Sequence, residues 1–110
     1  MASMRIPPDA IIADAKLTEY LLVQRSWDDK SGYLRRAGFT LDNWIDLRRA
    51  IRGLSDSVDA AEDGIDEYGT IYTVDGALAG PIGELPVRLI WMEKKIDRRF
   101  HFITLKPRKE

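Results

Sequence analysis

The first half of the chain has apolar residues at helical spacing. The strongest pattern follows Thr40, where apolar side chains recur every three or four residues at Trp44, Leu47, Ile51 and Leu54. Thr40 is a suitable N-cap, because Asn43 stands three residues later and the two side chains can bind free N–H groups of the first turn. We therefore predict an amphipathic helix that begins after Thr40 and ends near Gly53.

Two shorter helices are expected before it. The segment from Asp14 to Leu22 places its apolar side chains on one face, and Asp14 is its candidate N-cap. The second helix runs from Lys30 to Ala37 and should end at Gly38. Glycine readily adopts the left-handed conformation that follows a last helical turn.

The second half has the composition of β-strands. Gly69–Gly80 is rich in β-branched residues, and Gly80–Gly83 is a turn signal because Pro stands next to Gly. Two further strands are expected at Leu85–Lys94 and Arg99–Lys106, and Pro107 would end pairing on anything but an edge strand. These segments predict an antiparallel meander of three or four strands.

This order of elements indicates an α+β domain in which three N-terminal helices pack on the C-terminal meander. At 110 residues the chain fits a single domain. We divide it into a helical half at residues 4–54, an acidic connector at 55–66 and an antiparallel sheet at 67–106. Residues 1–3 read as an addition before a natural start at Met4.

Composition restricts the classes of function. With 45% apolar and 32% charged residues, the chain is typical of a soluble globular protein and not of a disordered one. The absence of Cys excludes disulfides, thiolate metal sites and thiol redox chemistry, and makes a cytoplasmic location the expectation. The apolar runs are much shorter than the ~20 residues that span a bilayer, so membrane insertion is not expected.

Acidic and basic residues are segregated along the chain. From Asp56 to Glu84 there are eight acidic residues and no Lys or Arg, whereas Leu85–Glu110 contains eight basic residues and three acidic ones. Basic side chains gathered on one surface raise the local potential even when the net charge is near zero. The C-terminal block is therefore a candidate surface for a polyanion, with RNA as the expected partner.

Five Arg and two Asp lie between Arg35 and Ser55. Arg carries a planar set of donors that suits phosphate oxygens, so Arg35 and Arg36 are candidate substrate-binding residues. The alternative is a solvated helix face on which Asp46 and Arg49 form an ion pair.

Neither face of the last two predicted strands is wholly polar. Simple alternation separates Val87, Leu89 and Trp91 from Arg88, Ile90 and Met92, and it separates Phe100, Phe102 and Thr104 from His101, Ile103 and Leu105. We expect the helices to cover one side of the sheet. The other side would then be a partly apolar, concave surface where a ligand binds.

Two charged or titratable side chains interrupt these strands. Arg88 is a candidate catalytic or anion-binding group, or else a snorkelling or ion-paired side chain whose partner is Glu67 or Asp75. His101 is the only His in the chain. It is the natural acid or base near neutral pH, or else a structural hydrogen-bonding group.

Aromatic residues complete the candidate set. If the protein cleaves RNA, Arg and Lys would stabilise the transition-state charge, and Tyr68, Tyr72, His101 or a Lys would transfer protons. Tyr72 and Trp91 can stack on a base or belong to the core. The acidic residues from Asp56 to Glu67 lack the spacing of a calcium loop, and phosphate-loop, dinucleotide and nucleophile-elbow motifs are missing. We therefore expect no metal and no cofactor.

Several short motifs are spread from Ile11 to Leu105: Lys16–Leu22, Lys30, Gly38–Phe39, Trp44, Glu67–Gly69, Tyr72–Asp75, Gly80–Pro81, Val87–Arg88 and Trp91. Together they resemble an uncharacterised bacterial domain family that occurs as short free-standing proteins and as C-terminal modules of polymorphic toxins. The resemblance implies a relation to compact α+β toxin domains, a group rich in metal-independent ribonucleases. The site residues that it implies are Lys16, Lys30, Arg88 and Trp91, with Tyr68 and Thr104 behind them.

This chain departs from the family at one loop. Where relatives carry a loop that contains His-Pro, it has Ser26–Asp29, so a His-dependent role is not expected there. The leading hypothesis is a toxin-like domain that cleaves RNA and is controlled by a cognate antitoxin or immunity protein. The alternative is a non-catalytic protein-interaction module, for which the mixed sheet face would be the interface.

Overall fold

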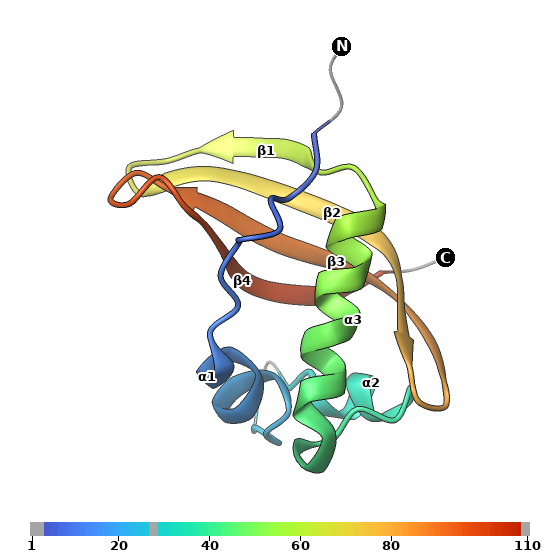
Figure 1. Cartoon of the computed structure of the whole chain (residues 1–110). Coiled ribbons are helices and arrows are strands. Elements are labelled where there is room, and N and C mark those ends of the chain that lie inside the picture. The colour runs from blue at the N-terminus through green and yellow to red at the C-terminus, as the bar shows by residue number, and fades with distance from the viewer. Residues whose placement is uncertain (1–3, 27–28, 109–110) are drawn as a thin grey trace.

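A computed structural model describes residues 4–26 and 29–108 (Figure 1). Helices occupy the N-terminal half and strands the C-terminal half, which confirms the predicted α+β class. The helical elements are α1 (Asp14–Lys16), which continues into the π-helical turn η1 (Leu17–Leu21), α2 (Ser31–Arg35), the 3₁₀ turn η2 (Leu41–Asn43) and α3 (Trp44–Ser57). The strands are β1 (Ala61–Ile65), β2 (Gly69–Gly80), β3 (Gly83–Lys94) and β4 (Phe100–Pro107). They form one antiparallel sheet in the order β1-β2-β3-β4.

Residues 55–66, predicted as an acidic connector, contain regular structure. α3 continues past Gly53 to Ser57, and β1 adds a fourth strand that pairs with β2. Gly53 lies on the exposed side of α3. It has no positive φ, so it does not form the left-handed turn with which a glycine ends a helix. Every residue of β1 is exposed. The strand therefore lacks the apolar alternation by which a half-buried strand is recognised in a sequence.

The start of α3 and its packing follow local sequence signals. Asn43 Oδ1 accepts a hydrogen bond from the Thr40 N–H at 2.7 Å, and the predicted capping box is complete. Gly38 has a φ of +93° after α2, as expected of a residue that ends a helix. α3 lies close to β2, because a Cβ at Gly76 would stand only 2.7 Å from Leu54 Cδ1. Glycine at this position lets the helix approach the sheet.

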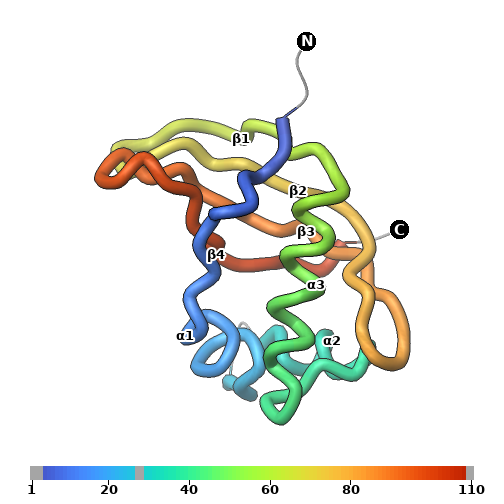
Figure 2. Tube along the Cα trace, viewed as in Figure 1, coloured from blue at the N-terminus to red at the C-terminus, as the bar shows by residue number. Residues whose placement is uncertain are grey.

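The N-terminal segment crosses the same face of the sheet as α3 (Figure 2). Ile11 continues the sheet beside β4: its N–H donates to the Phe100 oxygen, and its oxygen accepts from the Phe102 N–H, both at 2.8 Å. Arg48 and Arg52 of α3 donate to the carbonyl oxygens of residues 12 and 10. These two Arg, which the sequence suggested as part of a polyanion site, instead attach the N-terminal segment to α3.

The core lies between α3 and the sheet, and the opposite face of the sheet is open. The fully buried large side chains are Trp91, Phe39, Phe102, Leu17, Leu21, Leu34, Leu47, Ile51, Leu78, Leu89, Leu105 and Val74. The side chains directed to that opposite face, among them Thr73, Ile90, Met92 and Thr104, are only partly buried. The described helices are all too short or too polar to cross a membrane.

Candidate functional site

Outward side chains of three strands align in rows across the open face. Paired residues on neighbouring strands share a face, which produces the rows Ile71, Met92 and His101; Thr73, Ile90 and Thr104; and Asp75, Arg88 and Lys106. His101, Thr104 and Lys106 therefore follow one another along β4, the last strand of the sheet. We call these three residues the β4 polar row.

Thr104 belongs to this row because of a β-bulge. Simple alternation predicts Thr104 on the face of Phe102, and Leu105 on the face of His101. The structure shows the reverse, because the register shifts between Ile90 and Trp91 and leaves Ile103 without a partner on β3. Leu105 is fully buried as a result. The alternation predicted for β4 is therefore wrong beyond residue 102, since one extra residue exchanges the two faces of a strand.

Lys30 joins the row from the helical half. It stands at the start of α2, and its Nζ donates to Thr104 Oγ1 at 2.9 Å and to Tyr20 Oη at 3.1 Å in a part-buried position. The Arg25 guanidinium lies 4.9 Å from the centroid of the Tyr20 ring, and Lys30 Nζ lies 5.2 Å from it. Two cations are thus gathered around one aromatic ring beside β4. Lys30 and Thr104, both implied by the family resemblance, are brought together by the fold.

His101 is held by a carboxylate that the sequence had not identified. Its Nε2 lies 2.7 Å from Asp97 Oδ2, across the turn between β3 and β4. The Arg99 N–H and then the His101 ring, both hydrogen-bonded to Asp97, lower the pKa of that carboxyl group. An ionised Asp97 favours the proton on Nε2, so Nδ1 of a neutral His101 is the acceptor atom. The only available sequence signal was the spacing of four residues between Asp97 and His101, at the start of the last predicted strand.

Arg88 is engaged by its neighbour on β2. Its Nε and Nη2 donate to the two carboxylate oxygens of Asp75 at 2.7 and 2.9 Å, and Arg108 lies 3.8 Å from the same carboxylate. The hydrogen bond from Arg88 lowers the pKa of Asp75. The alternative in which Arg88 pairs with Asp75 is therefore confirmed. Two of its five N–H donors are engaged in this pair, and the charge of Asp75 offsets that of the guanidinium, which weakens its attraction for a phosphate.

Trp91 and Tyr72 face the helices. Trp91 is fully buried, and its ring meets Phe102 edge-on at 5.5 Å between centroids. Tyr72 is part-buried on the same side and lies 5.3 Å from the ring of Phe100. Burial, followed by the nearby charges of Glu93 and Glu62, raises the pKa of Tyr72. The interpretation of both residues as core is confirmed, and the indole of Trp91 presents no surface on which a base can stack.

Among the described residues, no hydrogen bond or ion pair joins the remaining predicted residues to the β4 polar row. Tyr68 is exposed in the turn between β1 and β2, and Lys16 ends α1. Arg35 lines a cavity of about 260 Å³ with the residues that begin η2. Arg36 lies over the ring of Tyr33, 5.3 Å from its centroid.

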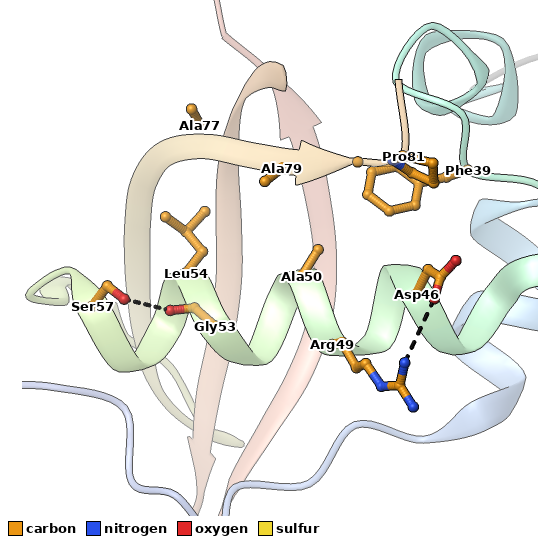
Figure 3. A pocket seen from close by; sticks show the side chains of 11 residues that line it. Phe39, Asp46, Arg49, Ala50, Gly53, Leu54, Ser57, Ala77, Ala79 and Pro81 are labelled. Atoms are coloured by element: carbon orange, nitrogen blue, oxygen red, sulfur yellow. Dashed lines mark hydrogen bonds and ion pairs between the residues drawn. The ribbon is translucent and has the colours of Figure 1, made fainter. Parts of the chain in front are cut away.

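A surface groove separates α3 from β2 (Figure 3). Its volume is about 720 Å³, and it is lined mainly by small and apolar residues, with Ala50 and Leu54 directed toward β2. Its charged groups are Asp46 and Arg49, which lie 3.8 Å apart as the sequence suggested. Gly80 closes one end, where a Cβ would stand 2.3 Å from a backbone oxygen. The groove offers shape, but its two charged side chains already face each other as an ion pair.

Acidic side chains do not converge on a metal site within the described residues. No group of three or more His, Asp or Glu side chains there is close enough to hold an ion. The acidic residues of the 56–67 region are distributed over the end of α3, β1 and the following turn. Asp59 pairs with Arg5 at 3.1 Å, and Asp66 accepts N–H groups of its own turn.

Comparison with known proteins identifies a family but no activity. The model of one family, described as "Domain of unknown function (DUF6883)", matches residues 8–109, nearly the whole chain. No curated protein and no solved structure matches the chain significantly. Because the match includes the N-terminal segment, the helices and all four strands, the chain belongs to the DUF6883 family.

Proposed function

We propose that this domain is a toxin-like ribonuclease that binds and cleaves RNA without a metal ion, at the β4 polar row and Lys30. The supporting observation is the hydrogen bond from Lys30 Nζ to Thr104 Oγ1. It places an ammonium group of the helical half beside the strand that carries His101 and Lys106. An imidazole and two ammonium groups thus lie along β4 on the open face of the sheet, as the resemblance to ribonuclease toxins leads one to expect.

The proposed reaction uses these groups in sequence. His101 Nδ1 accepts the proton of a ribose 2′-hydroxyl while its oxygen bonds to phosphorus. Lys30 and Lys106 stabilise the negative charge that develops on the phosphate oxygens. The bond from phosphorus to the 5′ oxygen then breaks, and this oxygen takes a proton from solvent. The products are a 2′,3′-cyclic phosphate and a 5′-hydroxyl, and a cognate antitoxin or immunity protein would restrain the activity in the cytoplasm.

The test is incubation of the purified domain with end-labelled single-stranded RNA in excess EDTA. We expect cleavage that leaves a cyclic phosphate, and no cleavage of the same oligonucleotide with 2′-deoxy sugars. His101→Gln should reduce the rate by at least about tenfold, since general acid–base groups contribute about 10²–10⁴. Lys30→Met should do the same, since loss of one group that stabilises transition-state charge costs about 10²–10³. Arg36→Gln is the matched control, because Arg36 is exposed and lies outside the site.

Intact RNA with the wild-type protein would refute the nuclease proposal. Equal loss of activity in Arg36→Gln would show that general charge, not this site, is responsible. Binding can be measured separately by anisotropy with the deoxy analogue. Its affinity should fall steeply with salt, because each contact from Lys or Arg to a phosphate releases counterions.

A specific observation favours a second function, that of a protein-interaction module. Ile65, Tyr68 and Ile96 are large apolar side chains that are mainly exposed at one end of the sheet. Apolar side chains gathered on a surface commonly mark a protein interface. Partner binding through such a surface would depend little on salt, which distinguishes it from RNA binding.

A further inference from the structure

At one end of the sheet, two neighbouring turns expose large apolar side chains to solvent. Ile65 and Tyr68 are each 67% exposed, and Ile96 is 90% exposed. Ile65 and Tyr68 come from the β1–β2 hairpin and Ile96 from the β3–β4 turn, which lie next to each other in Figure 1. The Lys95 N–H donates to the Tyr68 oxygen at 2.9 Å and joins the two turns.

Between the turns lies a cavity of about 590 Å³. It is lined by Glu67, Tyr68, Met92, Lys94, Lys95 and Ile96. We call these six residues, together with Ile65, the tip surface. The members of the proposed RNA site, Lys30, His101, Thr104 and Lys106, are not part of it.

Both turns are stabilised by hydrogen bonds of their own. Asp66 Oδ1 accepts the N–H groups of Tyr68 and Gly69 at 2.7 and 3.1 Å, and Asp97 Oδ1 accepts the Arg99 N–H at 2.9 Å. The tip surface is therefore preorganised. A partner that binds there loses little free energy in ordering the turns, so exposed apolar area contributes more fully to affinity.

Charged residues in and around the tip surface differ in sign between its two turns. The β1–β2 hairpin contributes acidic residues, among them Asp63, Asp66 and Glu67, and no basic ones. The end of β3 and the β3–β4 turn contribute Lys94 and Lys95, with Arg98 and Arg99 beside them. The acidic residue of this turn, Asp97, is already hydrogen-bonded to the Arg99 N–H and to His101. Within the part of the chain that the structure describes, Glu67, Lys94, Lys95 and Arg98 form no ion pair. The apolar centre is thus bordered by unpaired groups of opposite sign on opposite sides.

A surface of this kind is complementary to a rotated copy of itself. A two-fold axis through the apolar centre places the acidic turn of one chain against the basic turn of the other, and it does so twice. A nucleic acid would meet Glu67 in the cavity as well as the lysines, which makes a polyanion a poorer occupant. We infer that the tip surface is a homodimer interface, in which a second copy of this chain packs its Tyr68 and Ile96 against the same residues.

The interface is small, so the dimer should be weak. A stable interface buries about 800 Å² on each partner, and the tip surface comprises only seven residues. We expect dissociation constants in the micromolar range or above, and association that increases with protein concentration.

The first experiment is sedimentation equilibrium of the wild-type protein across roughly two orders of magnitude in concentration, centred on that micromolar range. We expect a reversible monomer–dimer equilibrium. Ile96→Asp should weaken it by at least about tenfold, because a charge would then be buried in the apolar centre. Ile82→Asp is the matched control: Ile82 is 75% exposed in the turn between β2 and β3, and its replacement should leave the equilibrium unchanged. A wild-type chain that stays monomeric throughout would overturn the inference.

The second experiment tests the two-fold arrangement by exchanging charges. Lys95→Glu alone would place acid against acid in its own dimer, and Glu67→Lys alone would place base against base. Each variant should therefore be monomeric, while an equimolar mixture should form a heterodimer in which both contacts again join opposite charges. Failure of the mixture to associate would refute this arrangement. So would a wild-type chain that binds only an unrelated protein at the tip surface.

Discussion

The hydrogen bond between Lys30 and Thr104 can be measured with a double-mutant cycle. Lys30→Met retains the aliphatic stem and removes the charge, whereas Thr104→Val retains the shape and removes the acceptor. Lys30 Nζ lies 2.9 Å from Thr104 Oγ1 in a part-buried setting. Hydrogen bonds to charged groups contribute roughly 1.5–3 kcal/mol, and Tyr20 keeps a second bond to the same ammonium when Thr104 is changed. We therefore expect a coupling energy of about 1 kcal/mol.

The assay is urea unfolding, followed by tryptophan fluorescence, for the wild-type protein, both single variants and the double variant. Thr104→Val alone should lower the unfolding free energy by about 1–2 kcal/mol, since the ammonium loses one acceptor. In a domain of this size, a loss of 1 kcal/mol corresponds to a fall in Tm of about 4 °C. Thr73→Val is the control partner for Lys30→Met, because Thr73 lies in the same cross-strand row on β2. This control pair should be additive within roughly 0.5 kcal/mol.

If the changes in unfolding free energy caused by Lys30→Met and Thr104→Val are additive within the limit set by the control pair, the reasoning is refuted. Lys30 would then not be positioned by Thr104, and the proposed RNA site would lose the cation that the fold brings to β4. If the coupling is found, Lys30→Met should also reduce the salt dependence of RNA binding. The expected change in the slope of log affinity against log salt is about 1, which corresponds to one lost phosphate contact.

Three further outcomes follow from the packing and the charges. Gly80→Ala should destabilise the fold by about 1–3 kcal/mol in thermal unfolding, since its Cβ would stand 2.3 Å from a backbone oxygen. Gly83→Ala is the control and should leave stability unchanged, because no atom lies within 4 Å of its Cβ. The pKa of Asp75 is lowered by its bond to Arg88, so the stability that this carboxylate contributes is present at neutral pH and is lost as the pH falls below about 4. Asp75→Asn should therefore flatten the acid limb of a plot of unfolding free energy against pH, and an unchanged limb would contradict the role of the pair. Trp91→Phe should lower the free energy of unfolding in urea by about 1–3 kcal/mol, because the smaller phenyl ring leaves a cavity in the core. An unchanged free energy of unfolding would argue against the core position of Trp91.

Elements with strong local signals were predicted from the sequence alone. The bounds of β2 agree with the prediction at both ends, and the turn that follows it is marked by Pro81. The capping box at Thr40 and the helix end at Gly38 also form as expected. Each of these features depends on a few neighbouring residues, so the information lies within a short window of the chain.

Elements without such signals were missed. β1 has no buried face, and its pairing with β2 is what makes it a strand. The bulge at Ile103 reverses which side chains at the end of β4 face the core, and no nearby residue in the sequence predicts it. Asp97 lies between two predicted strands and was not identified as a partner of His101, because that contact depends on how tightly the two strands are connected.

By itself, the sequence determined the order of helices and strands, the apolar faces that form the core, and the separation of acidic from basic residues. Only the tertiary structure decided which of those charges act together. It bound Arg88 to Asp75, directed Arg48 and Arg52 to the N-terminal segment, and brought Lys30 to Thr104 across 74 positions of the chain. The physical reason is that helix and turn preferences arise from neighbouring residues. The partner of a charged side chain, in contrast, depends on strand register, bulges and the path of distant segments, which are set when the whole core packs.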